Sequence, residues 1–143
     1  MSDVENDLPS IIEYSEDVAE AEAPPPIPQT TYPAVIKDAQ AKLSINKGTR
    51  YAEVMFHISA DQLPADFPAD IYPDGVTIAF RRISLEDNPV ARYRMRKFCE
   101  AIGAPAGKRI DMSEWIGLEA VVDVGHEVYE GLARHVIKGV KEQ

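Results

Sequence analysis

The sequence predicts a mainly β fold, namely a five-stranded Greek-key barrel with one α-helix between the third and fourth strands. Three observations support this prediction. Three strand-like stretches follow Thr31, a single capped helix with many basic residues comes next, and two more strand-like stretches follow the helix. This order of elements describes one small barrel domain.

The composition limits the classes of protein to consider. A chain of 143 residues is long enough for one ordinary domain with a buried core. No apolar run approaches the roughly 20 residues that span a bilayer, and the first residues are acidic, so we expect neither a membrane anchor nor a secretory signal. The single cysteine, Cys99, cannot form an internal disulfide, which favours a reducing, cytosolic setting.

The net charge of −9 is unevenly distributed. Eight of the 24 acidic residues lie in residues 1–30, which contain no Lys or Arg, so the rest of the chain is nearly neutral. Four prolines at the end of this segment favour an extended spacer. We predict a disordered, acidic, Pro-rich tail over residues 1–30 and a folded domain over residues 31–143. Such a tail either docks on a basic or apolar surface or acts only as a solubilising segment.

The first two predicted strands form a hairpin. The first covers residues 34–45, and Lys37 interrupts its apolar face, so we expect a β-bulge or a solvent-facing start there. Its inward face is predicted to carry odd-numbered residues, namely Val35, Ala39, Ala41, Leu43 and Ile45. Asn46-Lys47-Gly48 predicts a tight turn. In the second strand, residues 50–59, the inward residues are Ala52, Val54, Phe56 and Ile58.

A proline-containing loop over residues 61–74 separates the second strand from the third and is long enough to act as a lid or binding arm. The third strand, residues 76–83, carries Val76, Ile78 and Phe80 on one face and Arg81 on the other. Arg82 follows directly.

Capping residues define the predicted helix. Asn88 is a suitable N-cap, Pro89 fits the first turn and Gly103 ends the helix. Its apolar stripe consists of Ala91, Met95, Phe98, Cys99 and Ile102. Asp111-Met-Ser-Glu114 then predicts a short capped turn that places Trp115 in the core. The fourth strand passes through residues 118–124, a connection covers residues 125–130, and the fifth strand covers residues 131–138.

With one helix between strands three and four, these elements match the OB-fold, a common platform for single-stranded nucleic acids. Four stretches carry a further resemblance: Tyr32-Pro-Ala-Val-Ile-Lys-Asp-Ala39 leading to Tyr51-Ala-Glu-Val-Met-Phe56, the helix from Ala91 to Gly103, Asp111-Met-Ser-Glu-Trp-Ile-Gly117 before Ala120-Val-Val-Asp-Val124, and Tyr129-Glu-Gly131 before Val136-Ile-Lys-Gly139. On these stretches the chain resembles a family of small bacteriophage proteins that are regarded as OB-fold single-stranded-DNA-binding proteins.

The resemblance implies that the protein coats single-stranded DNA, without sequence preference, during phage DNA replication or recombination in the host cytoplasm. Single-stranded DNA would be its main partner, the acidic tail would contact replication or recombination proteins, and a homodimer is left open. The competing hypothesis is a protein-interaction module, either a virion accessory or an inhibitor, whose acidic tail docks on a basic partner surface.

Single-strand binding needs cations along a groove and aromatic faces on which bases stack. The candidate residues are Lys42, Lys47, Arg50, Tyr51, Arg81, Arg82, Tyr129 and Arg134. Tyr51 is the preferred stacking residue because alternation places it on the outer face of the second strand. Tyr72 in the long loop is a further candidate. The alternative is that Tyr51 only covers a barrel edge and the arginines form a solvated face.

The helix adds four cations, namely Arg92, Arg94, Arg96 and Lys97. Arg92 and Arg96 lie one turn apart and could contact phosphate, Glu100 or the acidic tail, of which the tail is favoured. The three histidines are scattered and show no nucleophile–base spacing, and the loop aspartates lack the spacing of a calcium loop. We therefore expect no enzyme activity, no cofactor and no metal.

Overall fold

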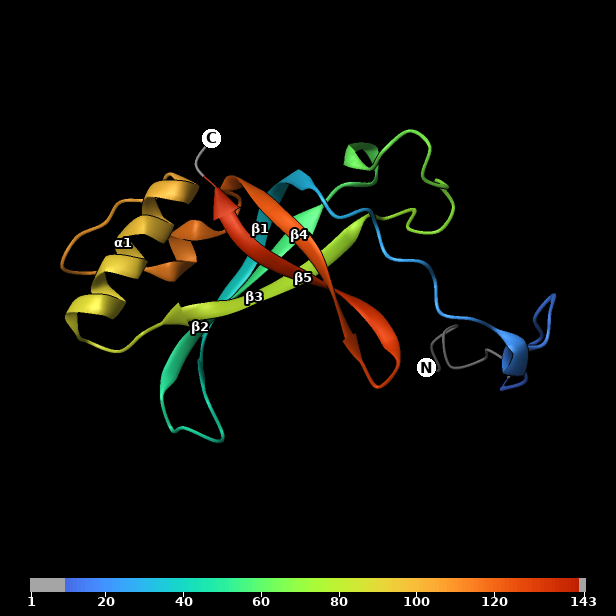
Figure 1. Ribbon diagram of the computed structural model, residues 1–143, viewed down its shortest axis with the longest axis horizontal. Helices are drawn as coiled ribbons and strands as arrows, with labels where there is room; N and C mark the ends of the chain where they lie inside the picture. Colours follow the sequence, from blue (N-terminus) through green and yellow to red (C-terminus); the bar gives the residue numbers. More distant parts are fainter. Residues whose placement is uncertain (1–9, 142–143) are drawn as a thin grey trace, which may run out of the picture.

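Five antiparallel strands form a single sheet in the computed structural model, which describes residues 10–141 (Figure 1). The strands are β1 (Thr31–Leu43), β2 (Arg50–Ile58), β3 (Val76–Ser84), β4 (Glu119–Tyr129) and β5 (Leu132–Lys141). The helix α1 (Pro89–Ile102) lies between β3 and β4, and three short 3₁₀ turns are η2 (Val18–Glu20), η3 (Ala60–Gln62) and η4 (Met112–Trp115). The mainly β fold with a helix at this point of the chain is confirmed. The part of the predicted tail before Ser10 lies outside the described residues.

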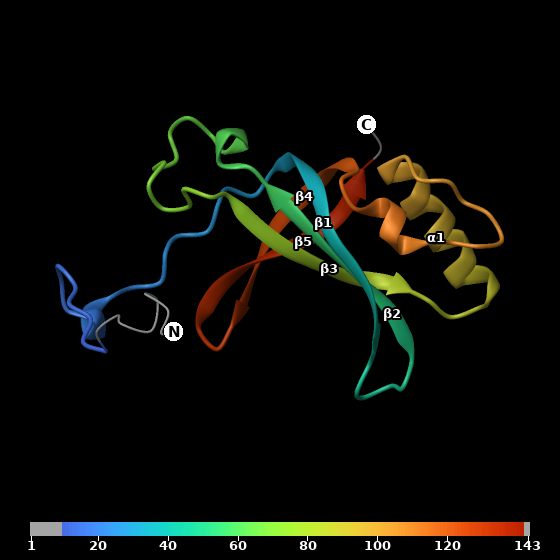
Figure 2. The ribbon, with the colours of Figure 1, turned by 180° about the vertical axis from the view of Figure 1, so that it is seen from behind.

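Strand β1 is shared between the two halves of the sheet. Its residues 31–35 pair with β4, and its residues 35–43 pair with β2, so that the strand order is β3-β2-β1-β4-β5. The sheet curls until β5 crosses close to β3 (Figures 1 and 2). Within residues 10–141, however, no hydrogen-bonded ladder joins these two edge strands. The sheet is therefore open along this β3–β5 seam, where the sequence predicts closure, because a groove lined by side chains of both strands separates their backbones.

The inward face of β1 differs from the prediction before Lys37, whereas after Lys37 the predicted inward residue Ala39 does pack against the core. The buried residues of β1 are the even-numbered Tyr32, Ala34 and Ile36, whereas Leu43 is 63% exposed and Ile45 is 98% exposed. The predicted bulge at Lys37 is confirmed, since Ile36 pairs with Phe56 and Asp38 with Met55. A bulge adds one residue and so reverses which parity faces the core. The last part of β1 also extends past the core into a projecting hairpin with β2 (Figure 1).

The hydrophobic core contains a cluster of four aromatic side chains from different elements. Phe56 of β2 and Phe80 of β3 face inward as predicted, and both contact Phe98 of α1, with ring centroids 6.5 and 6.0 Å away. Trp115 of η4 lies 5.2 Å from Phe98 and is fully buried, which confirms its predicted place in the core. The helix therefore seals one end of the sheet through Phe98 (Figure 1).

The predicted helix caps are confirmed. The Asn88 side chain accepts a hydrogen bond from the Ala91 amide at 2.9 Å, and Pro89 occupies the first turn. Gly103 ends the helix in the left-handed region, with φ of 74°. The Asp111 carboxylate caps η4 in the same way by accepting from the Ser113 amide.

The predicted connection over residues 125–130 is wrong, because β4 continues through it to Tyr129 and meets β5 in a two-residue turn. Glu130 and Gly131 both have positive φ, as a type I′ hairpin turn requires. Gly125 is a strand residue: a Cβ at this position would lie 2.2 Å from Lys138 Cε. Glycine here allows a close approach and does not mark a turn.

Residues 25–28, which we call the strap, fasten the N-terminal segment to the sheet. Ile27, which the sequence assigns to the tail, is fully buried in the core. The Ile27 amide donates to His135 Nε2 at 2.9 Å, and the Ile27 carbonyl lies 2.6 Å from His126 Nε2. Tyr72 and Tyr32 donate their hydroxyls to the carbonyls of Pro25 and Pro28. The long loop therefore packs on the strap, and Tyr72 is engaged there.

The two histidines that bind the strap, His126 and His135, have opposite tautomers. A carbonyl oxygen only accepts, so His126 must carry its proton on Nε2, whereas His135 accepts at Nε2 and must carry its proton on Nδ1. Their rings face each other from paired positions of β4 and β5, and Tyr72 packs edge-on against His135. Burial, and then the nearby His126, lower the pKa of His135.

We predict that acid weakens the strap through His135. Because its pKa is lower in the folded than in the unfolded protein, the neutral ring stabilises the fold above about pH 6.5, and this stabilisation is lost as the pH falls below that value. His135→Gln keeps an acceptor for the Ile27 amide but does not titrate. In denaturant melts across pH, the wild-type protein should therefore lose stability relative to His135→Gln on acidification. Parallel pH profiles of the two proteins would contradict this role.

Candidate functional site

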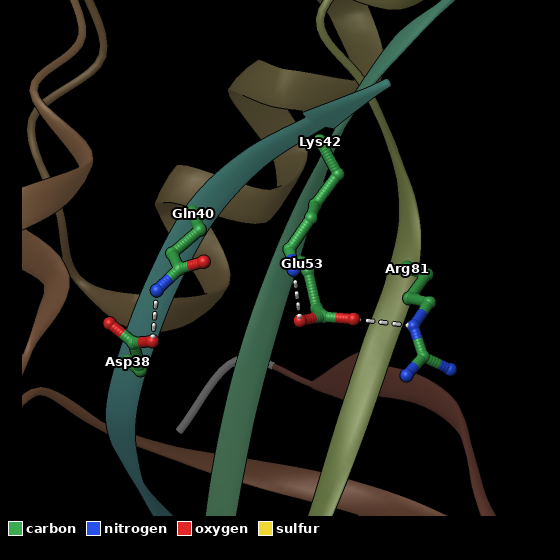
Figure 3. Close-up of polar contacts among 5 residues, drawn as sticks. All are labelled: Asp38, Gln40, Lys42, Glu53 and Arg81. Carbon is green, nitrogen blue, oxygen red and sulfur yellow. Dashed lines mark hydrogen bonds and ion pairs between the residues drawn. The ribbon is translucent and has the colours of Figure 1, made fainter. Parts of the chain in front are cut away.

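An ion-pair ladder crosses one face of the sheet. Glu53 of β2 lies between Lys42 of β1 and Arg81 of β3, with Lys42 Nζ 3.7 Å from Oε1 and Arg81 Nε 2.6 Å from Oε2 (Figure 3). Gln40 and Asp38 form a hydrogen bond beside this ladder at 2.9 Å (Figure 3). The alternation of β2 places Glu53 on the outward face, where this one carboxylate contacts both cations.

The carboxylate of Glu53 is held ionised by its neighbours. The hydrogen bond from Arg81 is the largest cause of a lowered Glu53 pKa, and the charges of Arg81 and Lys42 add to it. Arg81 remains well exposed in this pair. Its guanidinium can therefore exchange the carboxylate for another anion, such as a phosphate.

A second bulge places Arg82 on the surface beside Arg81. Val54 pairs with Phe80 and Ala52 with Ile83, so that Glu53 alone faces two β3 residues. Arg81 and Arg82 are both exposed as a result. Within residues 10–141 the Arg82 side chain forms no ion pair or side-chain hydrogen bond. The bulge therefore supplies an uncompensated positive charge at the edge of β3.

The β3–β5 seam contains a groove of about 560 Å³, which we call the seam groove. Residues 77–82 of β3 form one wall and residues 134–137 of β5 form the other, with Met55 and Glu127 at the sides. The groove brings together Arg81, Arg82 and Arg134, three of the predicted cations. Three guanidinium groups and one carboxylate line it, which makes the groove basic although the whole chain is acidic.

The β4–β5 hairpin supplies an aromatic residue beside this groove. Arg134 lies over the Tyr129 ring at 4.5 Å from its centroid, a cation–π geometry, and Nη2 of Arg134 is 3.4 Å from Glu127 Oε1. Tyr129 is nevertheless 55% exposed. The predicted pair Tyr129 and Arg134 is thus in direct contact.

The other predicted residues lie on the β1–β2 hairpin. Tyr51 is half-buried on the outer face and pairs with Lys42 across the strands, while Lys47 and Arg50 are exposed near the turn. Both hairpins project toward the lower edge of the two views, the β1–β2 hairpin on the side of α1 and the β4–β5 hairpin on the side away from α1 (Figures 1 and 2). The structure therefore places the predicted residues on two projecting hairpins and on the strands between them.

Two residues of this surface were missed by sequence reasoning. Glu53 orients two of the predicted cations, and Met55 contributes an apolar side wall of the seam groove. The available signal was the alternation of β2, which puts both side chains on the same outward face as Tyr51. A carboxylate and a thioether carry no nucleic-acid-binding pattern, so composition alone does not select them.

Two other features, a metal-binding cluster and a membrane-spanning helix, are absent from the part of the chain that the structure describes. Among residues 10–141, no group of three His, Cys, Asp or Glu side chains has the geometry of a metal site. No described helix combines the length and apolar character needed to cross a membrane.

No model of a known protein family matches this chain, and no curated protein matches it.

We predict a small, pH-dependent contribution of Glu53 to stability. At neutral pH, Glu53→Gln should lower the free energy of unfolding by roughly 0.2–1 kcal/mol, the scale of solvent-exposed ion pairs. Because the Glu53 pKa is lowered in the folded state, this contribution exists above the ordinary pKa of glutamate, about 4.3, and is lost as the pH falls below it.

The matched control is Glu127→Gln, since Glu127 and Arg134 are both more than half exposed and 3.4 Å apart. Denaturant melts at neutral and acidic pH provide the measurement. Equal losses in the two variants, or a Glu53→Gln difference that persists in acid, would show that the ladder on β1–β3 does not act as described.

Proposed function

We propose that this protein binds single-stranded DNA along the seam groove, without sequence preference, and coats the strand during phage DNA replication or recombination in the host cytoplasm. The observation that carries the proposal is the convergence of Arg81, Arg82 and Arg134 on one open groove, beside the exposed ring of Tyr129. Cations along a groove neutralise the phosphates, and aromatic rings stack with bases of any sequence.

The same proposal assigns the chain to the OB-fold in an open form. Three features support the assignment: the strand order β3-β2-β1-β4-β5, the sharing of β1 between two halves of the sheet, and the place of α1 between β3 and β4. In OB-folds, the central strands and the two flanking hairpins contact the nucleic acid. The predicted residues lie on the corresponding elements of this chain.

Single-stranded DNA fits the seam groove better than a duplex for a chemical reason. An unpaired strand exposes base faces for stacking on Tyr129 and Tyr51, and apolar base surface for contact with Met55. A duplex keeps those faces inside its helix. Its phosphates would have to supply nearly all of the affinity.

We predict tighter binding to oligo-dT than to duplex DNA of equal length, with an affinity that falls as salt rises. Fluorescence anisotropy of a labelled oligonucleotide measures both. Equal affinity for the two forms, or no binding at low salt, would contradict the proposal.

The matched variants sharpen this experiment. Tyr51→Ala should weaken single-strand binding by about 1–3 kcal/mol, the usual scale for one stacked base. Tyr93→Ala removes an equally large ring from the exposed surface of α1 and should leave binding unchanged. Thermal melts separate a lost contact from a lost fold.

The exposed apolar side chains of the acidic segment favour a second candidate function, docking on a protein. Ile11, Ile12, Tyr14 and Val18 are each more than half exposed among several carboxylates. An amphipathic acidic segment of this kind suits a basic partner surface, including the seam groove of the same or a neighbouring chain.

We predict that deleting residues 1–23 tightens single-stranded DNA binding at low salt. This deletion removes all eight tail acids, which are covalently joined to the domain and so would compete at an effective concentration in the millimolar range. It leaves Ile27 in place, so stability should be unchanged. Deletion through residue 30 would also remove this buried residue, at a cost of roughly 2–5 kcal/mol by analogy with Ile→Ala in a core.

Paired titrations of the full chain and the shorter deletion on one oligonucleotide provide the measurement. Identical curves would contradict competition by the tail and leave partner docking as its role.

A further inference from the structure

Helix α1 has two separate basic edges that face different neighbours. Arg92 and Arg96 line a cavity shared with the loop at residues 106–110. Arg94 and Lys97 line a different hollow, shared with β3 and β5. The helical period places these pairs three and four residues apart, so each pair forms one stripe. Sequence reasoning paired Arg92 with Arg96, and the packing of the helix places this pair on the loop side and Arg94 and Lys97 at the other hollow.

The hollow beside Arg94 and Lys97, which we call the helix hollow, is small and apolar at its base. It measures about 230 Å³, and its walls include Phe80 and Ile83 of β3, Phe98 of α1 and Val140 of β5. Arg82, Arg94 and Lys97 surround it. This volume is below the roughly 300–1,000 Å³ of pockets that hold drug-sized ligands. An apolar base with a cationic rim suits one nucleobase with its phosphates.

The cations on the two edges of the helix differ in their carboxylate partners. On the loop side, Arg92 pairs with Asp87, and Arg96 pairs with Glu100 at 3.1 Å. On the hollow side, Lys97 also contacts Glu100, at 3.2 Å.

The arginines of the helix hollow differ from those of the loop side. Within residues 10–141, the side chains of Arg82 and Arg94 form no ion pair or side-chain hydrogen bond. The helix hollow is therefore lined by two guanidinium groups that have no carboxylate partner among the described residues.

The seam groove and the helix hollow are neighbours that share two lining residues. Phe80 and Arg82 line both of them. Along the joint surface, five cations follow one another from the β4–β5 hairpin to the helix, namely Arg134, Arg81, Arg82, Arg94 and Lys97. Their carboxylate partners are Glu127, Glu53 and Glu100, so the path keeps an excess of positive charge.

We infer that a single strand bound in the seam groove continues past Arg82 into the helix hollow, where Arg94 and Lys97 contact its phosphates and one base lies against the apolar base of the hollow. This inference rests on the proposed function and extends its site onto α1. Unpaired bases stack on guanidinium planes as well as on aromatic rings, which suits Arg82 and Arg94.

The acidic tail of the same chain is a poorer occupant of the helix hollow. The strap residues Pro25 and Ile27 are hydrogen-bonded to Tyr72, His126 and His135 at one end of the sheet. In both ribbon views, α1 covers the opposite end, and residues 10–24 extend away from it (Figures 1 and 2). The cations around the helix hollow therefore suit an anion bound in the seam groove better than the acidic tail of the same chain.

The test compares two double variants of the same helix. Arg94→Ala with Lys97→Ala removes the edge at the hollow, and Arg92→Ala with Arg96→Ala removes equal charge from the loop side. Anisotropy titrations use oligo-dT of about 5 and about 16 nucleotides, which span the site sizes known for single OB-folds. A third variant, Arg94→Lys with Lys97→Arg, keeps both charges and should keep the salt slope of the wild type.

The expected result depends on oligonucleotide length. The Arg94/Lys97 alanine variant should bind the long oligonucleotide several-fold more weakly, with a salt slope reduced by roughly 1.4 for two lost contacts at about 0.7 each. It should bind the short oligonucleotide like the wild type, and the Arg92/Arg96 variant should match the wild type on both lengths. Thermal melts confirm that each variant is folded.

Two results would overturn the inference while leaving the proposed function intact: wild-type binding of the long oligonucleotide by the Arg94/Lys97 variant, or equal weakening in both alanine variants. Failure of the wild-type protein to bind either length would overturn the inference and the proposed function together.

Discussion

The sharing of β1 between β2 and β4 is the constraint on which the rest of the structure depends. Residues 31–35 of β1 pair with β4 and residues 35–43 pair with β2, so the two halves of the sheet meet only at β1, and the twisted sheet bends there. That bend brings the edge strands β3 and β5 together across the core, although they lie at the two extremes of the strand order. The seam groove, the aromatic cluster around Phe98 and the enclosed Ile27 all follow from this bend.

The open seam brings together basic side chains that are far apart in the sequence. The cations come from β1, β3, β5 and α1. Each carboxylate beside them pairs with one or two cations, so the cations outnumber the carboxylates in these pairs. Since each pair is solvent-exposed on the cationic side, the carboxylates orient the cations more than they stabilise the fold. The acidic net charge of the chain therefore coexists with a local basic path.

Much of the fold could be predicted from local patterns. The alternation of β2, the caps of α1 and the bulge at Lys37 are set by neighbouring residues, and the structure confirms them. The inward face of β1 before Lys37 was predicted wrongly because the bulge reverses the parity there. The length of β4 and the open seam were predicted wrongly because they depend on partners distant in sequence. The candidate site shows the same division: residue types identified the cations, but only the packing separates Arg94 from Arg92 and selects Glu53.

The strap also constrains the order in which the chain can complete its fold. Ile27 is hydrogen-bonded to His135, 108 residues later, so this contact closes nearly the whole chain into a loop. Contacts of such sequence separation form late, because the entropy of loop closure must be met before they contribute. During synthesis, Ile27 has no complete binding site until β5 has left the ribosome. The N-terminal segment therefore cannot complete its attachment to the sheet until the last strand of the sheet has been made.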